Sequence, residues 1–220
     1  MPAVGTLRKP GHGAVEMNVV NLGKPTAARK CEQPTCLWLT GLSGSGKSTI
    51  ARRLELWLSE VLDHPAYILD GDELRTGLNR DLGYGDADRT ENVRRVAEVA
   101  RLLVHAGVTP IVSLISPFRA DRLLARSRFA PEQFWEVFVD APLAVCERRD
   151  PKGLYARARR GELARFTGID SPYEPPLQPE LHLRTDIEDA HQCVEKIIER
   201  LVFARARHGQ AAPGKAQSGT

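Results

Sequence analysis

The sequence predicts an α/β fold in which helices flank a mainly parallel sheet of five strands. Two patterns support this prediction: short apolar runs of strand length alternate with stretches whose apolar residues recur every three or four positions. Strands that alternate with helices form βαβ units, which build a parallel, doubly wound sheet. The length of 220 residues and the 42% apolar content suit one such domain with short tails.

Five apolar runs are the predicted strands. They cover residues 36–39, 66–69, 109–114, 134–139 and 181–183. Three helices are predicted between them and after them, because apolar residues follow helical spacing near residues 50–61, 93–104 and 194–201. We expect Gly107 to end the second of these helices.

The two ends of the chain differ in composition from the middle. Residues 1–34 are rich in Gly, Pro, Lys and Ala, and we expect an N-terminal arm without a core of its own. Residues 206–220 are expected to be a disordered tail. The folded domain is therefore predicted to cover residues 35–205.

Composition also narrows the function classes. The formal net charge is only +3, and Lys and Arg are spread along the chain, so we expect no nucleic-acid partner. The four cysteines lack zinc-ligand spacing, and we expect reduced thiols. The sequence shows neither a membrane-spanning apolar run nor a signal peptide, so we expect a cytoplasmic protein without a membrane partner.

The strongest motif is GLSGSGKS at residues 41–48. It matches G-x-x-x-x-G-K-[ST] and lies between a predicted strand and a predicted helix, the context of a P-loop. Its glycines allow the backbone N–H groups to surround a phosphate. Lys47 is expected to reach the β- and γ-phosphates, and Ser48 to place its hydroxyl on Mg²⁺. We therefore predict a P-loop NTPase-type fold. The alternative is an ordinary Gly-rich turn, and the position of the motif between a strand and a helix argues against it.

Carboxylates follow the second predicted strand as Asp70-Gly71-Asp72. Open α/β sheets bind ligands at the carboxyl ends of their strands. Either carboxylate, Asp70 or Asp72, is therefore a candidate to orient Mg²⁺ or to accept the proton of an attacking hydroxyl. A turn with Asp72 as the helix N-cap is the alternative. The sequence has no N-K-x-D motif, which argues against a GTPase.

Three further polar segments are candidates for the acceptor site. Arg89 and Asn92 lie three residues apart at a helix start, where both can face one ligand, although a solvated helix start has the same pattern. Ser116 precedes a proline after the central strand and is expected to have an extended backbone. Ser116 either faces the crevice or, as the alternative, the Ser-Pro pair merely ends the strand. Residues 150–174 are rich in Arg and aromatic residues, and we expect a basic lid or, alternatively, a basic surface helix.

Together, these motifs resemble adenylylsulfate kinase. They are GLSGSGKST, DGDxxRxGLNxDLG, DRxENVRR, ISPFRADR and DPKGLYxxARxGE followed by FTGIDSPYE, and the resemblance covers about residues 36–202. It implies transfer of the ATP γ-phosphoryl to the 3′-hydroxyl of adenosine 5′-phosphosulfate (APS), which yields 3′-phosphoadenylyl sulfate (PAPS) and ADP in sulfate assimilation. It also implies ATP and Mg²⁺ as cofactors, a homodimer, and possible pairing with a sulfurylase subunit.

The resemblance assigns roles residue by residue. The implied ATP-binding residues are Gly41, Ser43, Gly44, Ser45, Gly46, Lys47, Ser48 and Thr49. The implied catalytic residues are Lys47, Asp72, Ser116 and Lys152, with Ser48 and Asp72 at the metal. The implied acceptor-binding residues are Asp72, Arg75, Tyr84, Arg89, Asn92, Ile115, Ser116, Lys152, Arg165 and Phe166. The family describes the residue at Ser116 as a phosphoserine intermediate, whereas we expect direct in-line transfer, which needs only positioning and charge.

Two positions depart from the family pattern. Tyr84 stands where Phe is usual and keeps a stacking face, while Glu73 stands where Asn is usual and is expected to add negative charge near the acceptor. Three other functions remain open from the residues: a P-loop kinase for another small acceptor, a non-catalytic module that binds nucleotide, and the kinase half of a bifunctional sulfate-activating protein.

Overall fold

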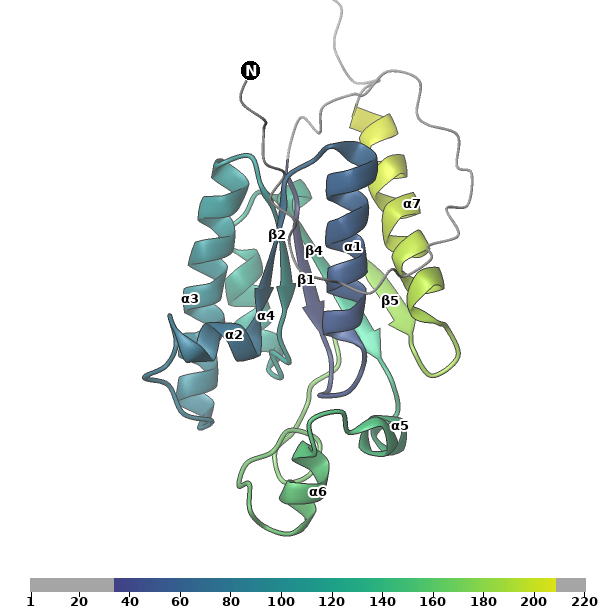
Figure 1. Cartoon of the computed structure of the whole chain (residues 1–220). Coiled ribbons are helices and arrows are strands. Elements are labelled where there is room, and N and C mark those ends of the chain that lie inside the picture. The colour runs from purple at the N-terminus through teal and green to yellow at the C-terminus, as the bar shows by residue number, and fades with distance from the viewer. Residues whose placement is uncertain (1–33, 209–220) are drawn as a thin grey trace, which may run out of the picture.

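A parallel sheet of five strands forms the centre of the protein. The computed structural model describes residues 34–208 (Figure 1). The strands are β1 (Cys36–Thr40), β2 (Ala66–Asp70), β3 (Thr109–Ser113), β4 (Phe134–Asp140) and β5 (Leu181–Arg184). Their order in the sheet is β2-β3-β1-β4-β5, and every pair is parallel. The predicted fold class is confirmed, with strand ends within a residue or so of the predicted ones.

Helices cover both faces of this sheet. The long helices α1 (Lys47–Leu62) and α7 (Ala190–His208) pack on one face, and α3 (Asp86–His105) and α4 (Arg119–Arg126) pack on the other. The remaining elements are short: α2 (Gly71–Thr76), α5 (Leu143–Arg149), α6 (Leu154–Arg159) and the 3₁₀ turn η1 (Pro131–Gln133). The apolar spacing predicted α1, α3 and α7, but it did not predict α4 or α5.

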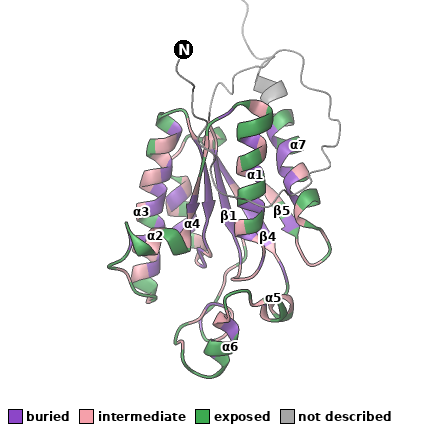
Figure 2. Cartoon of the chain, in the orientation of Figure 1, coloured by how far each residue is buried: buried purple, intermediate pink, exposed green. Residues whose placement is uncertain are grey.

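The alternation of side chains along the strands divides the core between the two faces. Leu37 and Leu39 of β1 pack with α1 and α7, whereas Cys36 and Trp38 pack with α3 and the buried Ala125 of α4. All of these residues are buried, and Figure 2 shows the strands buried within the layers of helices. A central parallel strand must be apolar on both sides for this reason.

The ends of the elements follow the sequence in part. Gly107, at a φ of 83°, follows the end of α3, as expected. Helix α7 continues to His208, past the expected domain boundary at residue 205. The expected arm at residues 1–34 and the rest of the expected tail lie almost wholly outside the described residues. Within residues 34–208 the cysteines are buried free thiols, and no helix there is long and apolar enough to cross a membrane.

All strands point toward the same end of the sheet. The P-loop, α2, the start of α3 and residues 114–118 lie at this end, and α5 and α6 extend beyond it (Figure 1). The parallel topology therefore collects the predicted motifs at one place, although they are far apart in the sequence.

Candidate active site

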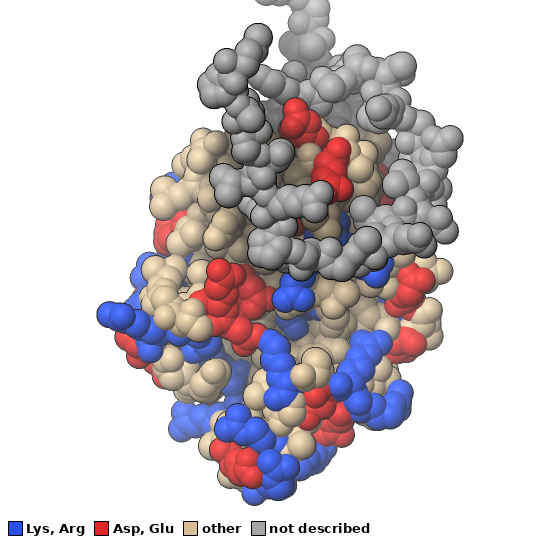
Figure 3. All heavy atoms as spheres, viewed as in Figure 1, with Lys and Arg blue, Asp and Glu red and all other residues tan. Residues whose placement is uncertain are grey.

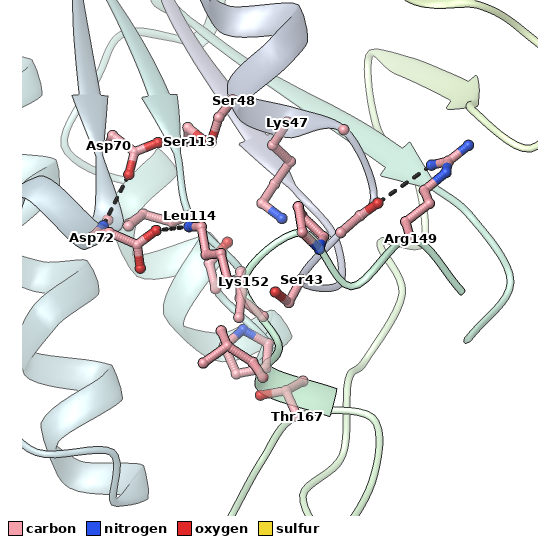
Figure 4. A pocket seen from close by; sticks show the side chains of 18 of the residues that line it. Ser43, Lys47, Ser48, Asp70, Asp72, Ser113, Leu114, Arg149, Lys152 and Thr167 are labelled. Atoms are coloured by element: carbon pink, nitrogen blue, oxygen red, sulfur yellow. Dashed lines mark hydrogen bonds and ion pairs between the residues drawn. The ribbon is translucent and has the colours of Figure 1, made fainter. Parts of the chain in front are cut away.

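A cavity of about 1100 Å³ opens at the carboxyl ends of the strands (Figure 4). Every predicted site residue lines it except Gly41 and Ser45, which lie beneath the P-loop surface. Lys and Arg gather on the lower half of the molecule, where the lid lies (Figure 3). The basic side chains that line the cavity are Lys47, Arg52, Arg75, Arg89, Arg149, Lys152, Arg157 and Arg165. They outnumber the acidic lining residues, so the cavity suits anionic ligands.

The P-loop needs glycine at its turns. A Cβ on Gly41 would lie 2.2 Å from the carbonyl oxygen of Val139, so only glycine lets the loop pass this closely over β4. Gly44 and Gly46 have φ angles of 73° and 104°, in the left-handed region. The loop then enters α1, whose N-terminus is a favourable place for a phosphate.

Lys47 is folded back over its own loop. Its Nζ donates to the carbonyl oxygens of Gly41 at 2.9 Å and Leu42 at 2.7 Å. Burial lowers the pKa of Lys47 to about 8, because the charged form loses solvation. A phosphate in the loop would add a direct charge partner for this ammonium group.

A hydroxyl and a carboxylate meet between β2 and α1. The Ser48 hydroxyl donates to Asp70 Oδ2 at 2.8 Å, and Ser113 Oγ lies 3.3 Å from Ser48 Oγ (Figure 4). Mg²⁺ prefers oxygen ligands and is commonly held by one or two side chains together with substrate phosphates, so this pair fits the ion. The sequence offered both Asp70 and Asp72 after this strand, and the resemblance assigned the metal to Asp72, whereas Asp70 is the carboxylate bonded to Ser48.

Asp70 also caps the next helix. Its Oδ1 accepts the backbone N–H of Asp72 at 3.0 Å, so the N-cap of α2 is Asp70 and the alternative assignment of the cap to Asp72 is wrong. The Asp72 carboxylate is thereby left to face the cavity, where it pairs with Lys152 of the lid (Figure 4). This ion pair spans the space between the P-loop and the second half of the cavity.

Aromatic and guanidinium groups form that second half. The Arg75 guanidinium lies 4.5 Å from the ring centroid of Tyr84 and donates to the carbonyl oxygens of Leu82 and Gly83. Asn92 is buried and accepts the amide of Asn79 at 3.0 Å. Arg75 and Asn92 are thus held in place by short-range contacts, and both line the cavity.

Arg89 connects the start of α3 to the lid. It is buried, and its guanidinium donates to the Tyr84 carbonyl at 2.9 Å, to the Arg165 carbonyl and to the Thr167 hydroxyl. Burial lowers the pKa of Arg89 from its ordinary value. The solvated helix start that remained an alternative is therefore wrong, because Arg89 lies inside the cavity wall.

Phe166 projects from the lid into the cavity wall. Its ring meets Tyr155 edge-on, with the centroids 5.0 Å apart. Arg165 has a φ of 57°, and the Asp170 carboxylate accepts the backbone N–H groups of both Arg165 and Phe166. This short turn fixes the direction of the Phe166 ring. Residues 150–174, called the lid below, contain the short helix α6, which carries the exposed Arg157 and Arg159, so a basic surface helix accounts for only part of this segment.

Ser116 differs from its predicted conformation. It has a φ of 40° rather than an extended backbone, and its side chain is buried. Its hydroxyl accepts from Trp38 Nε1 at 3.1 Å and donates to Thr40 Oγ1 at 3.0 Å. These contacts hold the left-handed conformation. The extended backbone expected from the proline at position 117 is therefore wrong.

Three other positions change the sequence-based view. Arg149, at the end of α5, donates to the carbonyl of Gly44 at 3.3 Å and to the hydroxyl of Thr185 at 3.2 Å, and both side chains line the cavity. Neither was predicted, because their motif signal is weak and their proximity depends on the fold. Glu73 lines a second cavity of about 450 Å³ that shares Ser48, Arg52 and Asp70 with the large one, and its expected effect on the acceptor stays a prediction.

Comparisons with known proteins agree with this site. The family model for adenylylsulphate kinase matches residues 33–184. The adenylyl-sulfate kinase of Pseudomonas aeruginosa is 57% identical over 175 residues, which cover 80% of this chain and 89% of that protein. The bifunctional enzyme NodQ of Azospirillum brasilense is 52% identical over 200 residues, which cover 90% of this chain but 32% of that protein.

A solved structure of a relative has a similar fold. The APS kinase CysC of Mycobacterium tuberculosis, in complex with AMPPNP and APS, has a TM-score of 0.74 at 50% identity and covers 77% of this chain and 98% of its own. The family match extends over most of the chain, and it includes the P-loop, the carboxylates after β2 and the whole lid. The chain therefore belongs to the adenylylsulphate kinase family.

Proposed function

We propose that this chain phosphorylates APS at its 3′-hydroxyl, using ATP with Mg²⁺, and releases PAPS and ADP in sulfate assimilation. The observation that carries the proposal is the two-part cavity: a P-loop with Lys47 at one side, an aromatic and basic pocket at the other, and the Asp72–Lys152 pair between them. The Mycobacterium tuberculosis relative was solved with an ATP analogue and APS together, which supports the same pairing of ligands here.

The P-loop half would bind ATP. Backbone N–H groups of the loop and the Lys47 ammonium bind the phosphates, while Arg149 and Thr185 fix the loop from the side of α5 and β5. Ser48 and Asp70 are the residues that would hold Mg²⁺. When bound, the ion neutralises charge on the β- and γ-phosphates. Asp72 remains a candidate for the same ion.

The lid half would bind the acceptor. Phe166 offers a ring face for the adenine, and Arg75, Arg89 and Arg165 offer guanidinium groups for the phosphosulfate. Asp72 would accept the proton of the 3′-hydroxyl, and Lys152 would neutralise the transferred phosphoryl group; their ion pair in the cavity supports this pairing of roles. Direct transfer needs no covalent intermediate, so Ser116 serves to shape the pocket.

Product identification tests this function. Radiolabelled ATP is incubated with Mg²⁺ and APS, and the labelled product is compared with authentic PAPS; AMP, shikimate and gluconate serve as alternative acceptors. We expect label in PAPS and none in the other products. Preferred labelling of another acceptor would contradict the proposed substrate, and nucleotide binding without transfer to any acceptor would favour a non-catalytic module.

The resemblance also supports a cytoplasmic homodimer. The resemblance also implies possible association with a sulfurylase subunit. The bifunctional enzyme NodQ, of which this chain covers 32%, supports such an association with a second activity. Light scattering of the purified chain should give twice the monomer mass of 24.3 kDa. A monomeric mass would contradict the dimer and leave the kinase proposal untouched.

A further inference from the structure

Three segments of the proposed site meet in a buried hydrogen-bond network beside the cavity. The first is the end of β1, directly before the P-loop. The second is the loop of residues 115–118, called the acceptor loop here, and the third is the end of the lid at residues 173–174. Ile115 and Tyr173 follow Thr40 by 75 and 133 residues in the sequence, and hydrogen bonds of the Thr40 side chain join the three segments directly.

Counting donors fixes the direction of the first hydrogen bonds. The Thr40 hydroxyl donates its one proton to the Ile115 carbonyl at 2.7 Å and accepts from Ser116 Oγ at 3.0 Å. The Tyr173 hydroxyl lies 3.0 Å from Thr40 Oγ1 and must therefore donate to its second lone pair. Burial raises the pKa of Tyr173 above its ordinary value, so this donor keeps its proton. Thr40 thus holds the acceptor loop and the lid at once.

Arg122 joins the same two segments a second time. It is buried, its Nη1 donates to the Ser116 carbonyl at 2.7 Å, and its Nη2 donates to the Glu174 carbonyl at 2.6 Å. Its Nε pairs with Glu136 of β4 at 2.6 Å, which compensates the buried charge. The guanidinium also lies 5.8 Å from the ring centroid of Tyr173.

The backbone adds a third connection. The Glu174 N–H donates to the Pro117 carbonyl at 2.9 Å, and the Glu174 carboxylate accepts from the Arg119 N–H at 2.7 Å. Ser116 itself is held at a φ of 40°, a conformation that is unfavourable for a residue other than glycine. Such strain persists only where the surroundings impose it, and here the network does so.

We propose that Arg122 and Tyr173 are positioning residues that clamp the end of the lid to the acceptor loop and so set the geometry of the acceptor pocket. The inference rests on the proposed function for the identity of the acceptor. Neither side chain lines the cavity, so both act through the residues that they hold. The P-loop is fixed separately by its packing over β4, so the clamp should affect the acceptor and not ATP.

Conservative variants test the clamp. Tyr173→Phe removes only the hydroxyl and keeps the ring beside Phe138, and we expect the KM for APS to rise about threefold to tenfold, the loss of one hydrogen bond. Arg122→Lys cannot make all three contacts, and we expect a rise of at least about tenfold. In both variants the KM for ATP should stay within about twofold.

Matched controls separate the clamp from general effects. Tyr67→Phe makes the same change at a half-exposed tyrosine of β2, and Arg101→Lys makes the same change in the partly exposed pair with Glu98. Both should keep the wild-type KM for APS. Hydrogen exchange adds a readout that needs no activity: peptides covering residues 114–119 and 170–176 should both exchange faster in Tyr173→Phe, by about threefold or more.

The outcomes distinguish the two proposals. If Tyr173→Phe leaves exchange of both peptides unchanged, the clamp is wrong, whatever the kinetics. If only thermal stability falls in Tyr173→Phe and Arg122→Lys while the KM for APS is unchanged, the residues are merely structural and the positioning role is wrong. If the wild-type protein does not phosphorylate APS, but both peptides exchange faster in Tyr173→Phe than in the wild type, the clamp stands and the proposed substrate is wrong.

Discussion

Lys47 shows how burial sets the chemistry of a single residue. The P-loop covers its side chain, and among residues 34–208 its ammonium group donates to loop carbonyls and to the Ser45 hydroxyl. The lowered pKa of about 8 records the cost of burying this charge without a carboxylate in contact. A bound triphosphate would supply the missing negative charge, so part of the binding energy of ATP comes from satisfying Lys47.

The sign of the pH dependence follows from this shift. Below pH 8 Lys47 is already protonated, whereas above it free protein must take up a proton to bind phosphate. We expect the Kd of a non-hydrolysable ATP analogue with Mg²⁺ to rise by up to about tenfold per pH unit above pH 8. Calorimetry in buffers of different ionisation enthalpy measures this proton uptake.

The matched variant is Lys47→Met. It should lose this part of the pH dependence and lower turnover at least about 100-fold, because the cation at the transferring phosphoryl is gone. A variant that retains the slope would assign the titration to another group, and near-normal turnover would contradict the role of Lys47.

Ser116 gives a second prediction at the residue scale. Its hydroxyl is fully engaged with Trp38 and Thr40, so Ser116→Ala should lower kcat/KM only about tenfold, the scale of lost hydrogen bonds. Steady-state kinetics with APS measures this loss, and rapid-quench mass spectrometry follows phosphate on the protein. A phosphoserine at this position that forms and decays as fast as turnover would contradict direct transfer.

At the scale of elements, the lid is the part whose shape comes from contacts with other elements. The Asp170 carboxylate fixes the Arg165–Phe166 turn through two backbone N–H groups, and the guanidinium of Arg89 of α3 donates to the Arg165 carbonyl of the same turn. Backbone hydrogen bonds to Asp170 lower the pKa of its carboxyl group, so the turn keeps its acceptor at neutral pH. The ring of Phe166 thereby lies in the cavity wall, edge-on against Tyr155.

The lid therefore predicts separate ligand effects. Phe166→Ala should weaken APS about 10- to 100-fold, since stacking on a base contributes about 1–3 kcal/mol. The Kd of the ATP analogue should change less than about threefold, because the ATP half of the cavity is untouched. Calorimetric titration of each ligand decides this, with Phe166→Tyr as the variant that keeps the ring. Loss of ATP binding with intact APS binding would show that the two halves are assigned the wrong way round.

At the scale of the whole molecule, periodicity predicted what the core requires and missed what depends on distant contacts. Five strands and three long helices followed from apolar spacing, because each must bury a face of its own. Helix α4 was missed because half of its residues are charged, and its buried Arg122 is stabilised by Glu136 and by the carbonyls of Ser116 and Glu174. Long motifs predicted the cavity residues, whereas Arg149 and Asp70 acquire their partners only when the strands are assembled.

The same architecture separates stability from activity. Ile197 of α7 is fully buried with Leu54 of α1 on the sheet face, and neither residue lines the large cavity. Ile197→Ala should lower the free energy of unfolding by about 2–5 kcal/mol, through lost burial and a residual cavity. Ile187→Ala, the same change at a residue that is 70% exposed, should change it by less than about 0.5 kcal/mol. Urea unfolding at an unchanged m-value measures both.

The activity of the same variant should be unaffected. The kcat and KM values of Ile197→Ala should stay within about twofold of the wild-type values when both are measured at about 20 °C, below the onset of unfolding. A selective rise in the KM for APS in Ile197→Ala would show that this face of the core is coupled to the acceptor pocket, contrary to the separation argued from the layers.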